Sequence, residues 1–280
     1  MKLRIVPLIA IVLALCFILI GCGDKFKGDY KEITSEQKTE YSEKVSNVKK
    51  EVEKENMKTT IMYTFTDTGV QGNEINVTIK GTCLVDKTDA NNFKYSGDFD
   101  LSNGEETRVC KLKVYYTDND DKVYVDFTYH SSVEDDVTHD YSVTGTINKD
   151  NLNEPDPSWI PFGIDMFMGF AKLPNTVFDP FVEMKLTDDK KMYVDGDKIK
   201  IVEIDKKATN HTEVYINTNK NDFGIQLIGK STDENGNDDG KSESIFEISL
   251  TNDTVTIPEI ENNIGYVYEI YRCIMLVMCY

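Results

Sequence analysis

Apolar and polar residues alternate along most of the chain from residue 61 to residue 147. Six successive segments there carry apolar side chains at every second position, with mostly Thr, Lys, Asp and Ser between them. The segments contain Tyr63, Val77, Phe99, Leu112, Val125 and Val143. Such alternation predicts antiparallel strands with one buried and one solvent-facing side. The stretches between them are rich in Gly, Asn and Asp, which suits hairpin turns.

The same period of two returns after residue 181. It begins at Met192, passes the hairpin signal Asp195-Gly196 and ends with Val255 and Ile257. Together the two regions predict roughly eleven strands. We therefore predict an α+β fold, built as a mostly antiparallel curved sheet or an incomplete β-barrel.

Two helical segments accompany these strands in the prediction. Thr34 and Gln37 have the spacing of a capping box. After them, an apolar stripe recurs at helical spacing on an otherwise polar segment, at Tyr41, Val45, Val48 and Val52. This pattern predicts an N-terminal amphipathic helix that lies on a sheet. The second segment, 159–174, is a central apolar helical segment too short to span a bilayer.

The alternating pattern also divides the chain into a predicted domain, a linker and a tail. Residues 34–262 form one predicted antiparallel-sheet domain, whose halves, 34–147 and 159–262, are joined by a linker at 148–158 that contains two prolines. Residues 263–280 are a strongly apolar tail of unclear role. Three interpretations remain open, in this order: a final helix or strand packed in the body, a second membrane contact, or an altered reading of the gene's end.

The first residues have the layout of an export signal. Lys2 and Arg4 precede an apolar run at 5–20, which has about the length of a signal-peptide core. The run ends in Leu19-Ile20-Gly21-Cys22, which resembles the lipobox of prokaryotic lipoproteins. This resemblance implies that 1–21 is a cleaved signal peptide and that Cys22 carries a diacylglycerol. Residues 22–33 would then be a lipidated tether to the cell membrane. The alternative is an uncleaved N-terminal anchor with an incidental cysteine, which also places the domain outside the membrane.

The net charge of the chain bears on which partners the protein can bind. The chain contains 31 Lys and Arg against 49 Asp and Glu, a net charge of -18. Such a surface repels the phosphates of nucleic acids, so no nucleic-acid partner is expected. Motifs for a nucleophile, a P-loop or a metal site are missing from the sequence. We therefore expect no catalytic residue, no metal and no cofactor, and a protein that is not an enzyme.

Cys83 and Cys110 both fall on the buried side of predicted strands. A disulfide between them is conceivable outside the cytoplasm. However, two strand spacings of a flat meander amount to ~9.6 Å, beyond the ~6.8 Å that a disulfide allows between Cα atoms. Only tight curling of the sheet or another strand order would join them, and the pairing stays open.

The order of elements resembles that of the LolA/LppX type of lipoprotein carriers. The shared features are an anchor cysteine, an amphipathic helix, hairpin-linked strands, a mid-chain apolar segment and more strands. The resemblance implies a half-barrel that holds acyl chains beneath short helices. It points to a non-catalytic binding or carrier protein for an apolar or lipid-like ligand.

The central segment supplies the candidate ligand-binding residues, which are large or pliable apolar side chains: Trp159, Phe162, Met166, Phe167, Met168 and Phe170. An ordinary core helix over the same sheet is the competing interpretation of this segment. The alternative function is a cell-envelope structural or protein-interaction lipoprotein without a small ligand. Its outer strands would contact an envelope protein or the wall, and a predicted exposed Tyr124 and the acidic loops are compatible with that role.

Overall fold

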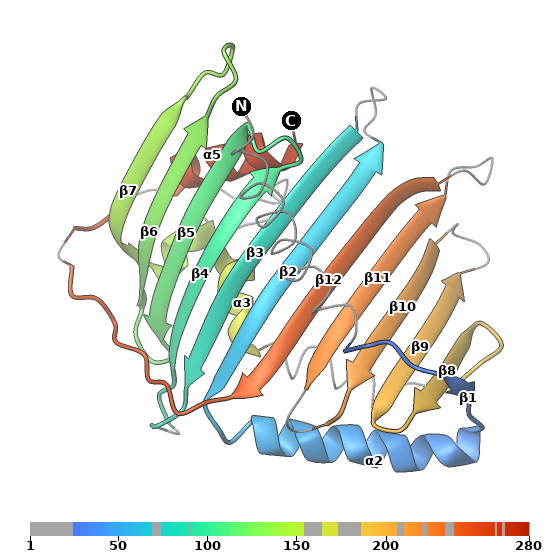
Figure 1. Ribbon diagram of the computed structural model, residues 1–280. Coiled ribbons are helices and arrows are strands. Elements are labelled where there is room, and N and C mark those ends of the chain that lie inside the picture. The colour runs from blue at the N-terminus through green and yellow to red at the C-terminus, as the bar shows by residue number, and fades with distance from the viewer. Residues whose placement is uncertain are drawn as a thin grey trace, which may run out of the picture.

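The computed structural model describes residues 25–68, 74–89, 91–153, 164–172, 186–205, 210–219, 223–232, 238–260, 262–264 and 267–279. Its main feature is one twelve-stranded sheet, in the order β1-β8-β9-β10-β11-β12-β2-β3-β4-β5-β6-β7 (Figure 1). All neighbouring strands pair antiparallel. The prediction of a mostly antiparallel curved sheet of α+β class is confirmed.

The strands are β1 (Lys31–Glu32), β2 (Met57–Thr68), β3 (Glu74–Asp86), β4 (Lys94–Asn103), β5 (Arg108–Thr117), β6 (Lys122–Ser131), β7 (Asp140–Asn148), β8 (Lys190–Asp195), β9 (Lys198–Asp205), β10 (Asn210–Asn217), β11 (Gly224–Thr232) and β12 (Asp238–Leu250). Most pair with their neighbours in sequence. Two junctions join distant parts of the chain: β12 lies beside β2, and the short β1 extends the sheet beyond β8.

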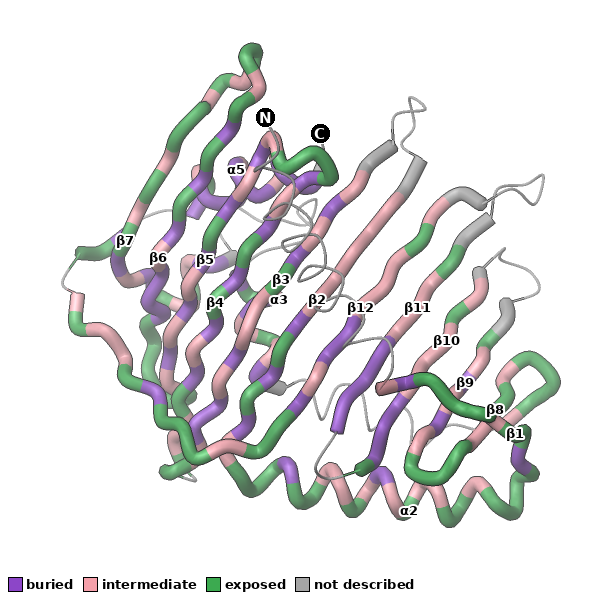
Figure 2. The backbone as a smooth tube through the Cα atoms, viewed as in Figure 1, coloured by how far each residue is buried: buried purple, intermediate pink, exposed green. Residues whose placement is uncertain are grey.

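Burial follows the alternation of the sequence. In β4, Tyr95, Gly97, Phe99, Leu101 and Asn103 are buried, while the residues between them are exposed or half-buried. Figure 2 shows the same alternation along the neighbouring strands. We call the face that carries these buried residues the inner face, and the opposite face the outer face.

The helical elements are α2 (Ser35–Val52), the 3₁₀ turns η1 (Lys149–Asn153) and η2 (Phe170–Lys172), α3 (Ile164–Gly169) and α5 (Tyr268–Cys279). Helix α2 runs along the ends of β8–β12 (Figure 1) and buries Val45 and Val52. At its start, the Thr34 amide donates a hydrogen bond to Gln37 Oε1 at 3.1 Å. Among the described residues, we find no helix that is both long and apolar enough to cross a membrane.

The apolar tail forms helix α5, which packs on β3, β4 and β5. Its buried side chains include Ile270, Tyr271, Cys273 and Ile274. The Tyr271 hydroxyl donates to the Leu152 carbonyl oxygen at 2.7 Å. Residues 267–279 of the tail therefore pack against the sheet.

The strand predicted at Val255 and Ile257 is wrong. Residues 251–260 have no regular secondary structure, although Val255 is buried. The Val255 amide donates to the Asp86 carboxylate at 3.0 Å instead of to a strand partner. Pro258 has no N–H to donate to a ladder, so continued pairing is disfavoured here.

Cys83 and Cys110 are buried free thiols. Cys83 lies opposite Gly97 of β4, whereas Cys110 lies opposite Leu101, so β4 and a four-residue offset separate them. Burial raises the pKa of Cys83 to about 12. Both are structural core residues in this sheet.

Candidate ligand-binding face

Two glycines of the inner face make room for one phenylalanine ring. Gly81 lies directly opposite Phe99, and Gly97 precedes Phe99 by two positions on the same face. A Cβ atom on Gly81 would lie 2.4 Å from the Phe99 ring, and one on Gly97 would lie 2.5 Å from it. The ring of Phe99 therefore lies directly over both glycines, close to the backbone of the sheet.

The central segment packs on Phe99 through α3 and η2. The Phe99 ring centroid lies 4.7 Å from that of Phe167 and 5.7 Å from that of Phe170. Phe170 in turn lies 6.0 Å from Phe246 of β12. These distances are typical of favourable aromatic pairs. The cluster fixes α3 and η2 above β4 and reaches towards β12.

Tyrosine hydroxyls hold the backbone of α3. Tyr95 donates to the Phe167 carbonyl oxygen at 2.6 Å, and Tyr116 donates to the Met168 carbonyl oxygen at 3.2 Å. The last carbonyls of a helix have no partner within it, so these bonds satisfy groups that would otherwise be buried unpaired. Burial raises the pKa of Tyr95 well above its usual value, which keeps it a neutral donor.

The predicted ligand residues have different environments. Phe167 is fully buried and belongs to the core. Met166, Met168 and Phe170 are half-buried and pack against that core. Trp159 and Phe162 lie outside the described residues. Tyr95, Phe99 and Tyr116, which position α3, were not among the candidates, because their alternating pattern matches that of any core strand residue.

Three partly exposed apolar side chains and one serine form a row across the inner face beside this cluster. Tyr63 of β2 pairs with Ser244 of β12, which pairs with Leu227 of β11, which pairs with Val214 of β10. Paired residues of neighbouring strands point to the same side of a sheet. We define the inner patch as seven half-buried residues, four on the inner face of the sheet and three in the central segment above it: Tyr63, Phe65, Val214, Leu227, Met166, Met168 and Phe170.

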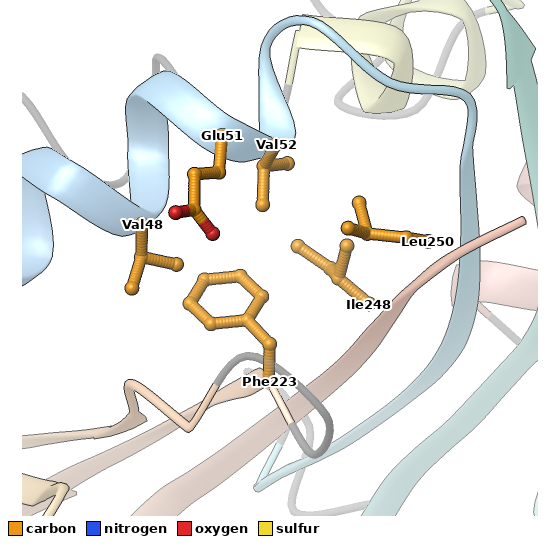
Figure 3. Close-up of a pocket in the computed structure, with 6 residues that line it drawn as sticks. All are labelled: Val48, Glu51, Val52, Phe223, Ile248 and Leu250. Carbon is orange, nitrogen blue, oxygen red and sulfur yellow. The ribbon is translucent and has the colours of Figure 1, made fainter.

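The space under α2 is too small for a ligand. Val48, Glu51 and Val52 of α2 face Phe223, Ile248 and Leu250 around a cavity of about 10 Å³ (Figure 3). Such a volume has room for about one water molecule. Helix α2 therefore closes this end of the sheet by close packing.

The outer face carries a compact charged cluster. Glu213 contacts Lys200 at 3.1 Å and His211 at 3.0 Å, and it accepts a hydrogen bond from the Tyr215 hydroxyl at 2.5 Å. Burial alone would raise the pKa of Glu213, but these donors outweigh it and lower the pKa to about 2. The charges of this cluster are paired with each other. Within the part of the chain that the structure describes, no group of three or more His, Cys, Asp or Glu residues is placed to hold a metal ion.

The expectation of an exposed Tyr124 is wrong. Tyr124 is only 8% exposed, and its ring packs edge-to-face against Tyr115 with centroids 5.4 Å apart. Two bulky tyrosines paired across neighbouring strands exclude water from each other. The envelope-interaction hypothesis thus loses the side chain that supported it.

Comparison with known proteins does not assign this chain to a family. No protein-family model matches the chain, and no curated protein matches it. Among solved structures, the chain is similar to a DUF1329 family protein from Desulfovibrio piger. That match covers 79% of this chain and 94% of the other, with 8% sequence identity and a TM-score of 0.30.

Proposed function

We propose that this protein is a lipid-anchored extracytoplasmic lipoprotein that binds an apolar or lipid-like ligand on the inner patch, without catalysing a reaction. The observation that supports the proposal is the inner patch itself. Its aliphatic, aromatic and methionine side chains stay partly exposed next to a well-packed core. Ligand sites for apolar molecules have this composition, and methionine side chains adapt to varied shapes.

The anchor is part of the proposal. Cys22 lies outside the described residues, and the lipobox resemblance assigns it a diacylglycerol. Each buried CH₂ of an acyl chain contributes about 0.8 kcal/mol, so two or more chains hold a protein firmly at a membrane. In this proposal the membrane is the partner of the N-terminal lipid, and the folded body lies outside the cytoplasm.

Two neighbouring residues of β11 provide a matched test of the patch. Leu227 and Ile228 are both half-buried and point to opposite faces of the sheet. We expect Leu227→Asn to weaken binding of a fluorescent fatty acid about tenfold, because it removes an apolar contact worth about 1.5 kcal/mol. Ile228→Asn should leave binding unchanged. Titration of both variants by fluorescence measures this, and equal affinities for the two would contradict the proposal.

A further inference from the structure

The segment that follows the anchor cysteine is attached to the outer face. Phe26 is 3% exposed, and the Tyr30 hydroxyl donates to the Phe26 carbonyl oxygen at 2.6 Å. The Tyr30 ring packs edge-to-face against Tyr215 of β10 with centroids 5.8 Å apart. Lys198 Nζ donates to the Lys27 carbonyl oxygen at 2.5 Å. Figure 1 shows this segment crossing the outer face of the sheet towards β1. Residues 25–33, which the sequence assigns to a tether, are thus folded against the body.

Residue 25, where the described part of the segment begins, lies over β11, between β10 and β12. The Lys25 side chain lies against Gly224 of β11, where a Cβ atom would meet Lys25 Cε at 2.9 Å. Two nearby residues of the outer face, Gln226 and Ile245, are paired with each other and are 9% and 4% exposed. The start of the segment therefore lies on the face of the sheet, away from its two edges.

The remaining link to the lipid is short. Only Gly23 and Asp24 separate Cys22 from Lys25, so the two Cα atoms bounding this link are at most ~11 Å apart. The twelve strands, by contrast, span roughly 50 Å from edge to edge. A link so short, fixed to the face of a broad sheet, holds that face close to the membrane.

The charge of the segment is compatible with this placement. Residues 25–33 carry three lysines and two acidic residues, in a chain whose net charge is -18. With Asp24, residues 23–33 carry three lysines and three acidic residues, so the part of the protein nearest the anchor has no net charge. Anionic headgroups therefore repel it less than they repel a strongly acidic surface.

We propose that the outer face of β10–β12 around Gly224 lies on the headgroup layer of the membrane that holds the lipid at Cys22. The inner patch then faces away from that membrane, open to the surrounding compartment. This inference rests on the proposed lipidation of Cys22. It adds a fixed orientation, which a free tether would not give.

Two labelled variants of the full, acylated protein test the orientation in vesicles that contain anionic lipid and a lipid with a nitroxide on its headgroup. Ser249→Cys places a fluorophore on exposed outer-face residue 249, two positions from the partner of Gly224. Val137→Cys places it on the loop between β6 and β7, at a residue 88% exposed. We expect at least about twofold quenching at position 249, because the link is only ~11 Å long, and little at position 137. The unsubstituted chain, treated in the same way, gives the labelling background.

A third variant and a separate readout distinguish the possible failures. Phe26→Ser should release the segment and reduce the quenching at position 249 to that at position 137. Flotation with the vesicles reports the anchor independently. A protein that does not float contradicts both the lipidation and the orientation. A protein that floats but shows equal quenching at both positions contradicts the orientation alone.

Discussion

Replacing Phe99 with alanine is expected to destabilise the protein by about 4 kcal/mol, as removal of a fully buried phenylalanine usually does. Phe99 is 0% exposed and contacts both Phe167 and Phe170. Its loss would uncover two glycines and remove the surface on which α3 packs. Denaturant unfolding followed by circular dichroism measures the change. Phe170→Ala, at a half-buried position of the same cluster, should cost clearly less.

A double-mutant cycle with Gly97 tests the cause of this effect. In the natural chain, Gly97→Ala should be destabilising by about 1–3 kcal/mol, because the new Cβ would lie 2.5 Å from the Phe99 ring. In the Phe99→Ala background that clash is absent, and the same change should cost less. Additive effects of the two substitutions would show that Phe99 does not lie over Gly97 as described.

The second large effect concerns a buried ion pair at the end of the sheet where β5 begins. Arg108 contacts Asp136 through two hydrogen bonds of 2.7 Å, and their side chains are 11% and 7% exposed. Ser131 and Tyr129 donate to the same carboxylate. We expect Asp136→Asn to cost about 3 kcal/mol, because it leaves the arginine charge buried without its partner. Thermal unfolding at neutral pH measures the loss.

The same pair predicts how stability depends on pH. The hydrogen bonds from Arg108 lower the pKa of Asp136 to about 2, below the value of about 4 expected in the unfolded chain. The resulting stabilisation is complete above pH ~4 and is lost as the pH falls through ~2. Asp136→Asn should therefore flatten this part of the stability profile. Asp140→Asn, in an exposed pair with His130, should change stability by less than about 0.5 kcal/mol. An unchanged acid profile in Asp136→Asn would contradict this account.

The sheet could be predicted from the sequence because the period of two persists wherever one face is buried. The prediction failed at Val255, where a side-chain acceptor on Asp86 replaces a strand partner. The pairing of β12 with β2 could not be predicted, since an alternating pattern shows which side of a strand is buried but not which strand lies beside it. Turn signals identify only pairings between strands that are consecutive in the chain.

Only part of the candidate site could be predicted from the sequence. Phe167 and Phe170 belong to one apolar run, and composition alone cannot tell the buried ring from the half-exposed one. That distinction depends on residues far away in the chain: the Tyr95 hydroxyl that holds Phe167 comes from a position 72 residues earlier. The role of the two glycines beneath Phe99 could not be predicted either. A glycine inside a strand can mark a bulge, a bend or a close contact, and the sequence does not distinguish these.

The central claim, that the inner patch binds an apolar or lipid-like molecule, is tested most directly by the contents of the protein itself. The full chain would be purified under mild conditions from its own membrane, separated from free lipid, extracted with solvent and analysed by mass spectrometry. We predict an apolar or lipid-like molecule at a near-stoichiometric ratio to protein, distinct from the acyl chains proposed for Cys22 and depleted in Leu227→Asn. A protein that yields no such molecule, and that also fails to take up fluorescent fatty acids, would contradict the account.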